Sequence, residues 1–225
     1  MGGIGVGLGS AFGTGGGIGR AAYSERVLAL YPESLIQYLP LSEASGPTAI
    51  DLSGNARHGT YSAAGVTYSE PGIGDGNTAV KFSGADTHVA IGSTTIGDAW
   101  NGDKFSMVAW GRVDDAARWT DATSYRYLTH LRADDATYYV VMGKSTTPNQ
   151  LEWRRRTGGP IVSITHTYAP SGTLDWFCMG MTFDIATPRL RCYLNGQLIS
   201  ESTSVNLTAW GANPPTGGAT VRCSG

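Results

Sequence analysis

Between residues 35 and 202 the chain consists of short segments of strand-forming residues, separated by glycine, proline, asparagine, aspartate and serine. Apolar and polar residues alternate within most of these segments, which is typical of β-strands that bury one face. No helical period interrupts the series, whereas parallel strands need long crossover connections that are usually helices. Strands that follow one another in this way form a sandwich or a barrel. The sequence therefore predicts an all-β fold.

The segments that we expect to be strands are Leu35–Leu41, Gly59–Ser62, Ala79–Phe82, His88–Ile91, Phe105–Val113, Arg126–Ala133, Thr137–Met142, Leu151–Arg156, Ile161–Tyr168, Trp176–Phe183, Arg189–Leu194 and Gln197–Ser202. Asn195-Gly196 joins the last two segments. A type I′ turn prefers this pair, because both of its central residues need a positive φ. The last two strands are therefore predicted to form a hairpin.

The same alternation decides which side of each strand faces the core. Cys178 points away from the apolar face of Trp176–Phe183, whereas Cys192 lies on the apolar face of Arg189–Leu194. Ladder partners share one face of a sheet, so these cysteines point to opposite sides and we expect free thiols. The side chains expected to be buried between two antiparallel sheets are Leu39, Phe82, Trp110, Phe177, Met179, Met181, Phe183 and Leu190.

Two segments precede the predicted strands. Residues 21–34 are expected to be a short helix and linker, with Ser24 as the N-cap and Pro32 ending the helix. Residues 1–20 include ten glycines, which lose too much backbone entropy to fold alone, and their lack of a basic start argues against a signal peptide. They are either a flexible tail or an assembly arm. The anchors of such an arm would be Ile4, Val6, Leu8, Phe12 and Ile18.

Charge and hydropathy exclude two classes of partner. The 16 basic and 18 acidic residues give a formal charge of −2, which attracts no nucleic acid to the whole surface. No run of about 18 apolar residues is present, so we expect no membrane insertion.

The spacing of the reactive residues does not favour catalysis. The carboxylates lack the close Glu-x-Asp-x-x-Glu arrangement that sandwich-fold glucanases use, and no G-x-S-x-G motif is present. Asp114-Asp115 and Asp134-Asp135 are adjacent pairs at strand ends, where solvated turns are expected. No His-x-x-x-His or Cys-x-x-Cys spacing indicates zinc. We therefore do not expect an enzyme.

One polar turn is a candidate metal site. Asp51, Ser53, Gly54 and Asn55 combine a carboxylate, an amide oxygen and backbone carbonyls, which are ligands that calcium accepts. The alternative is an Asx-type turn, in which the side chain bonds to its own backbone. A single carboxylate makes a poor calcium site, so the turn is the favoured interpretation.

An aromatic ring and several guanidinium groups lie close together in one predicted strand. Trp153 faces one side of this strand, whereas Arg154 and Arg156 face the other. With Tyr138 or Tyr139 from a neighbouring strand they would form a strip for sugars, which stack on rings and accept hydrogen bonds from planar donors. The alternative is a solvated sheet face or a subunit contact. The candidate ligand-binding residues are Tyr139, Trp153, Arg154 and Arg156.

Several stretches follow one another in a recognisable order: Tyr23–Gly46, Asp51-Leu-Ser-Gly-Asn55, His58-Gly-Thr-Tyr61, Val80-Lys-Phe-Ser-Gly84, Phe105–Val113, Trp176–Asp184 and Leu190–Leu198. Together they resemble the laminin G-like, concanavalin A-like domain, from about residue 23 to the end of the sequence. The opening resembles especially the version found in tail and other virion proteins of tailed bacteriophages.

The resemblance implies a two-sheet antiparallel jelly roll over residues 35–225 that binds glycans or proteins and is not catalytic. Only Asp51 and Asn55 match the calcium positions of the family. The family usually closes with a further strand carrying an Asp-Glu-hydrophobic motif, whereas this sequence ends in Val221-Arg-Cys-Ser-Gly225. The sandwich is therefore expected either to lack its closing strand or to have it supplied from elsewhere.

The leading hypothesis is a non-enzymatic virion protein that displays its sandwich or contacts a host surface glycan, and that attaches through its N-terminal arm. Its partners would be other virion proteins and copies of itself, after assembly in the host cytoplasm. The first alternative is an extracellular carbohydrate-binding module, secreted or on the cell surface. The second alternative is a glycoside hydrolase of the same fold, against which the missing carboxylate cluster argues.

Overall fold

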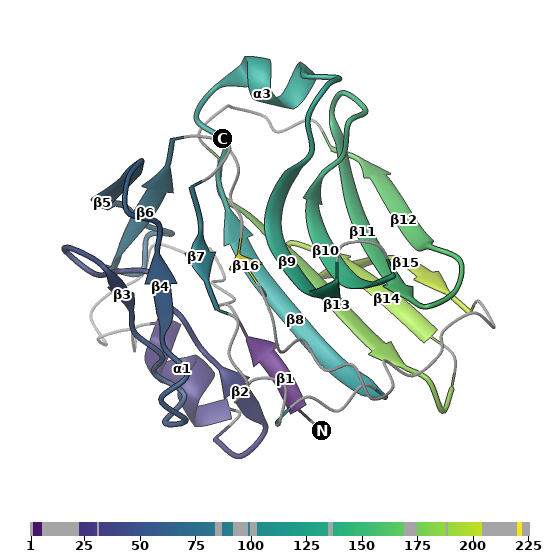
Figure 1. The fold of residues 1–225 in the computed structure, drawn as a ribbon, viewed down its shortest axis with the longest axis horizontal. Helices are drawn as coiled ribbons and strands as arrows, with labels where there is room; N and C mark the ends of the chain where they lie inside the picture. Colours follow the sequence, from purple (N-terminus) through teal and green to yellow (C-terminus); the bar gives the residue numbers. More distant parts are fainter. Residues whose placement is uncertain are drawn as a thin grey trace, which may run out of the picture.

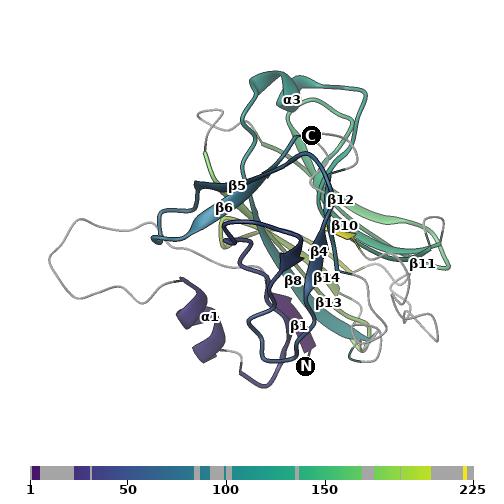
Figure 2. The same cartoon turned by 60° about the vertical axis from the view of Figure 1, so that its left-hand side comes forward.

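The computed structural model describes residues 2–5, 23–30, 32–83, 87–91, 99, 103–134, 137–168, 175–187, 189–203 and 220–221, with the backbone alone at 2–5, 133–134 and 220–221. These residues form two packed β-sheets, a separate two-stranded hairpin and short helices (Figure 1). In Figure 1 the strands β9, β10 and β11 lie in front of β8, β13 and β14. Figure 2 shows β11 to the right of the same three strands. The fold is the all-β sandwich that the sequence predicts.

One sheet has six strands in the order β15-β14-β13-β8-β1-β2. Its neighbouring strands are antiparallel, except that β1 is parallel to both β8 and β2. The strands of this sheet are β1 (Gly2–Gly5), β2 (Leu35–Gln37), β8 (Lys104–Gly111), β13 (Phe177–Asp184), β14 (Arg189–Leu194) and β15 (Gln197–Ser202).

The other sheet has eight antiparallel strands in the order β12-β11-β10-β9-β16-β7-β4-β3. Its strands are β3 (Thr48–Ala49), β4 (Gly59–Tyr61), β7 (Val89–Ala90), β9 (Arg126–Asp134), β10 (Tyr138–Lys144), β11 (Gln150–Thr157), β12 (Val162–Thr167) and β16 (Thr220–Val221). The remaining elements are the hairpin of β5 (Val66–Pro71) and β6 (Thr78–Phe82) and the helices α1 (Tyr23–Leu30) and α3 (Ala116–Thr120).

Every segment predicted to be a strand contains a strand of the structure, with ends that differ by up to a few residues. Asn195 and Gly196 have φ angles of 50° and 81°, as a type I′ turn requires, so the hairpin of β14 and β15 is confirmed. The sequence does not predict β1, β3, β5 or β16. Of these, β16 lies between β7 and β9 and pairs with both.

Residues 2–5, expected to belong to an assembly arm, form part of the domain's own sheet. They lie between β8 and β2, with Gly2–Gly5 opposite Phe105–Val108. Ladders on both edges satisfy the backbone groups and offset the entropy lost by the glycines. The backbone of Ile4 is therefore paired within the domain, and the expectation that its side chain anchors the chain to another subunit stays a prediction. The other proposed anchors, Val6, Leu8, Phe12 and Ile18, lie outside the described residues.

The predicted helix is present as α1, and it ends before Pro32. Ser24 is not its N-cap, because it lies inside the helix, where its Oγ accepts a hydrogen bond from the Tyr38 hydroxyl at 3.0 Å. No helix in the described ranges is long and apolar enough to cross a membrane. The helix is held by a small apolar cluster of Tyr23, Val27, Leu35 and Tyr38.

The main core lies between the two sheets. Buried there, as predicted, are Leu39, Phe177, Met179, Met181, Phe183 and Leu190. Phe82 and Trp110 are only partly buried. Phe82 still packs against this core, whereas the prediction is wrong for Trp110. Phe82 belongs to the separate hairpin, and Trp110 lies on the face of β8 opposite to the buried Met107 and Ala109.

The cysteine prediction is confirmed for the two cysteines that the structure describes. Cys178 lies opposite Trp110 in the ladder, whereas Cys192 lies opposite the core residue Met181. The two side chains therefore point to different faces, and both are free thiols. Burial raises the pKa of the Cys178 thiol to about 12, so it stays protonated at neutral pH.

A pair of substitutions on adjacent residues of β13 tests the assignment of its faces. Met181 is completely buried, so Met181→Ala should lower the free energy of unfolding by about 2–5 kcal/mol. Thr182 points to the other face and is partly exposed, so Thr182→Ala should cost less than about 1 kcal/mol. Urea denaturation measures both values. Equal losses for the two variants would contradict the assignment.

Candidate functional site

The polar turn at Asp51 is bonded to its own chain. Asp51 Oδ1 accepts hydrogen bonds from the backbone N–H groups of Tyr38 (2.8 Å) and Ser53 (2.9 Å). Its Oδ2 accepts from Ser53 Oγ (2.8 Å) and from the N–H of Arg57 (2.9 Å). The side chain is buried, and it ties the turn to the segment after β2. The bond from the Ser53 N–H is that of the predicted Asx-type turn, and those from Tyr38 and Arg57 join this turn to neighbouring segments.

The same turn fits a calcium ion poorly. Asn55 turns its amide nitrogen inward, donating to the carbonyls of Leu35 (2.8 Å) and Ile36 (3.2 Å). Calcium takes about six to eight oxygen ligands, whereas both oxygens of Asp51 already accept two donors each. In the part of the chain that the structure describes, no three His, Cys, Asp or Glu side chains gather as metal ligands would.

Removing the Asp51 carboxylate should destabilise the fold. Asp51→Ala leaves buried backbone donors without an acceptor, so we expect a loss of about 2–4 kcal/mol in the free energy of unfolding. Asp75 is a matched control, because its carboxylate bonds only to Asn77 in its own turn and is less buried. Asp75→Ala should cost less than about 1 kcal/mol. A calcium chelator should not shift the melting temperature of the wild type, and a large shift would favour the metal site.

Three of the four predicted ligand-binding residues lie on one face of the eight-stranded sheet. Tyr139 on β10 lies opposite Arg156 on β11, and Val141 lies opposite Arg154, so these side chains share the outer face. Trp153 does not join them, because its ring is completely buried in the core. The structure therefore brings Tyr139, Arg154 and Arg156 together and separates Trp153 from them.

The outer face is an internally bonded network. Arg154 Nη2 donates to both carboxylate oxygens of Glu152 (2.7 and 2.8 Å) and to the hydroxyl of Tyr125 (2.7 Å). Ser163 Oγ donates to the same carboxylate at 2.6 Å. Only 7% of Tyr139 is exposed. A sugar would have to displace these internal bonds, so this face fits a structural network better than a binding strip.

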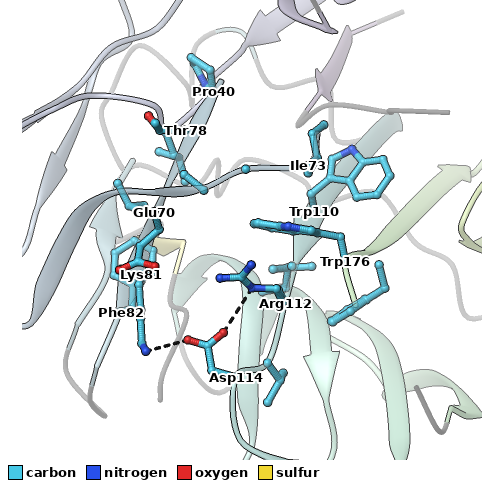
Figure 3. A pocket seen from close by; sticks show the side chains of 18 of the residues that line it. Pro40, Glu70, Ile73, Thr78, Lys81, Phe82, Trp110, Arg112, Asp114 and Trp176 are labelled. Carbon is cyan, nitrogen blue, oxygen red and sulfur yellow. Dashed lines mark ion pairs between the residues drawn. The ribbon is translucent and has the colours of Figure 1, made fainter. Parts of the chain in front are cut away.

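A cavity of about 410 Å³ offers a more open site, between the β5–β6 hairpin and the ends of β8 and β13. Figure 3 shows Trp110 and Trp176 on one side of it, and Glu70, Thr78 and Phe82 on the other. Apolar walls that enclose a few polar groups are typical of sites for small molecules and single sugar residues. This cavity is the candidate functional site.

An ion-paired cluster forms the lower part of the cavity in Figure 3. Asp114 lies between two cations, with Oδ2 at 2.7 Å from Lys81 Nζ and Oδ1 at 3.3 Å from Arg112 Nε. The Arg112 guanidinium also lies over the Trp176 ring, 5.2 Å from its centre. The hydrogen bond from Lys81 holds the pKa of the Asp114 carboxyl below its ordinary value. The carboxylate is therefore ionised at neutral pH.

Lys144 lines the same cavity but is committed to the fold. Its side chain is buried, and its Nζ donates to the carbonyls of Asp121 (2.5 Å) and Ser145 (2.8 Å). Burial lowers the pKa of its ammonium group. These two hydrogen bonds connect the loops at the end of β10 and so stabilise this wall of the cavity.

The sequence by itself does not predict this cavity. Its walls come from segments around residues 38–41, 70–83, 110–115 and 176, which are far apart in the chain. Trp110 was assigned to the core, and Asp114 to a solvated turn. The signal that could have indicated the cavity is the sequence from the end of β8 onward. There Trp110, Arg112 and Asp114 occupy every second position, which places their side chains on the same side of an extended chain.

Comparison with known proteins adds little to this geometry. No protein-family model matches the chain, and no curated protein is similar to it in sequence. Among solved structures, domains LG4-5 of the mouse laminin α1 chain are similar with a TM-score of 0.36 and 11% identity. The match covers 46% of this chain and 24% of the laminin chain. A likeness this weak carries no function across, and the fold class rests on the two packed sheets themselves.

Proposed function

We propose that this protein is a non-catalytic β-sandwich domain that binds glycans in the cavity between the β5–β6 hairpin and the ends of β8 and β13. The observation that carries the proposal is the pair of indole rings beside the ion-paired cluster of Lys81, Arg112 and Asp114. Sugar rings present apolar C–H faces that stack on aromatic rings, and hydroxyls that bond to carboxylate and guanidinium groups. The cavity offers both kinds of contact at short range.

The charged groups in the cavity favour glycan binding over glycoside hydrolysis. A glycosidase needs a carboxylic acid with a raised pKa beside a second carboxylate. The pKa of Asp114 is instead lowered, mainly by its hydrogen bond with Lys81, so Asp114 is a poor proton donor at neutral pH. We therefore propose no hydrolytic role for this cavity.

The setting that we propose is a phage particle, in which the domain contacts a host surface glycan. Support comes from the sequence, since Tyr23–Gly46 resembles the opening of the version of this domain found in phage virion proteins. The partners would be other virion proteins and further copies of this chain. An extracellular binding module is the alternative. Both settings use the same cavity.

Loss of one ring should weaken glycan binding without unfolding the domain. Trp176 is partly exposed in the cavity, so Trp176→Ala should weaken binding to any glycan found on an array by at least about tenfold. Tyr193 is a matched control, because it is a partly exposed aromatic residue on β14, outside the residues that line the cavity. Tyr193→Ala should bind like the wild type. Equal binding by all three proteins would contradict the proposed site.

Mass spectrometry of purified particles separates the two settings. If the domain is a virion component, its peptides should appear in stoichiometric amount in particles that have been washed and banded. Binding on a glycan array together with absence from particles would favour the extracellular module.

A further inference from the structure

We propose that the cavity selects neutral sugar residues and rejects acidic ones, because the cations of the cluster beside its two indole rings are already paired with carboxylates. This inference rests on the proposed function, and it names the class of ligand for the same site. It depends on four side chains: Glu70, Lys81, Arg112 and Asp114.

The two oxygens of Asp114 are each held by a different cation. Lys81 reaches one of them from β6, and Arg112 reaches the other from the segment after β8, as the dashed lines in Figure 3 show. The Lys81–Asp114 pair therefore joins the hairpin to the segment after β8. An incoming ion would have to compete with a partner that is already in place.

Glu70 adds a second carboxylate to the cluster. It lies on β5, next to β6 in the hairpin, and its charge raises the pKa of Lys81 together with the larger effect of Asp114. Glu70 also lines the cavity, above Lys81 in Figure 3. Two carboxylates and two cations leave this cluster with no net charge.

A neutral sugar can use this cluster without breaking it. Hydroxyl groups both donate and accept, so they can bond to carboxylate oxygens and guanidinium N–H groups that keep their ion-pair partners. A uronic acid or sialic acid would bring a carboxylate that must lose its hydration, and it would find both cations already paired with Asp114. The same cluster thus favours the neutral class of sugar over the acidic one.

Arg112 also limits where the sugar can stack. Its guanidinium lies against one face of the Trp176 ring, at 5.2 Å from the ring centre, and its side chain is only 17% exposed. The sugar must therefore stack on the opposite face of Trp176 or on Trp110. Stacking there places hydroxyl groups near the cluster and leaves the Arg112–Asp114 pair intact.

Matched sugars test this selection on the full chain. Methyl glucoside, galactoside and mannoside differ from the corresponding methyl uronides only in the oxidation of C6. Calorimetry or ligand-observed NMR should detect binding of at least one neutral glycoside. The affinity for its uronide should be lower by at least about tenfold, the change that corresponds to one pKa unit of charge interaction. Asp114→Asn removes one negative charge from between Lys81 and Arg112, so the uronide should gain affinity and the gap should narrow to about threefold or less.

Asp184→Asn is the matched control. Asp184 pairs with Lys104 at 3.1 Å and is 31% exposed, as Asp114 is, but it lies outside the residues that line the cavity. This variant should keep the wild-type preference. A uronide that binds the wild type as well as the neutral glycoside, or an unchanged gap in Asp114→Asn, would overturn the selection and leave glycan binding standing. Absence of binding by every sugar tested would overturn the proposed function as well.

Discussion

β8 and β13 pair along their whole length, from Phe177 opposite Gly111 to Asp184 opposite Lys104, and this ladder decides which side chains face the core. Its inward face carries Met107 and Met181, which are opposite one another and fully or almost fully buried. The side chains on the other face are turned away from the sandwich. The cavity uses this second face, since Trp110 belongs to it.

The segments at the two ends of the described chain each connect two neighbouring strands, β1 in the six-stranded sheet and β16 in the eight-stranded sheet. β1 lies beside β8 and joins it to β2, and β16 joins β9 to β7. Without these strands, backbone groups of their neighbours in both sheets would lose their partners. The integrity of the sandwich therefore depends on pairings between residues that are very distant in the sequence.

Two clusters of arginine and aromatic residues illustrate what makes a surface available for binding. On the outer face of the eight-stranded sheet, Arg154 donates hydrogen bonds to Glu152 and Tyr125, and these bonds leave few of its N–H groups for a ligand. In the cavity, Arg112 also has a carboxylate partner, but a hollow of about 410 Å³ lies beside the pair. Composition is similar in the two places, so the space beside the charges distinguishes them.

The sequence by itself determined most of the described strands, the turn at Asn195-Gly196, the opposite faces of Cys178 and Cys192, and the self-bonded turn at Asp51. Each of these follows from local rules: alternation with a period of two, the φ requirement of a turn, and the reach of a short side chain to its own backbone. Only the tertiary structure decided the place of β1, the burial of Trp153 and the existence of the cavity. These depend on which distant segments meet, and alternation fixes the two faces of a strand without saying which neighbour covers each of them.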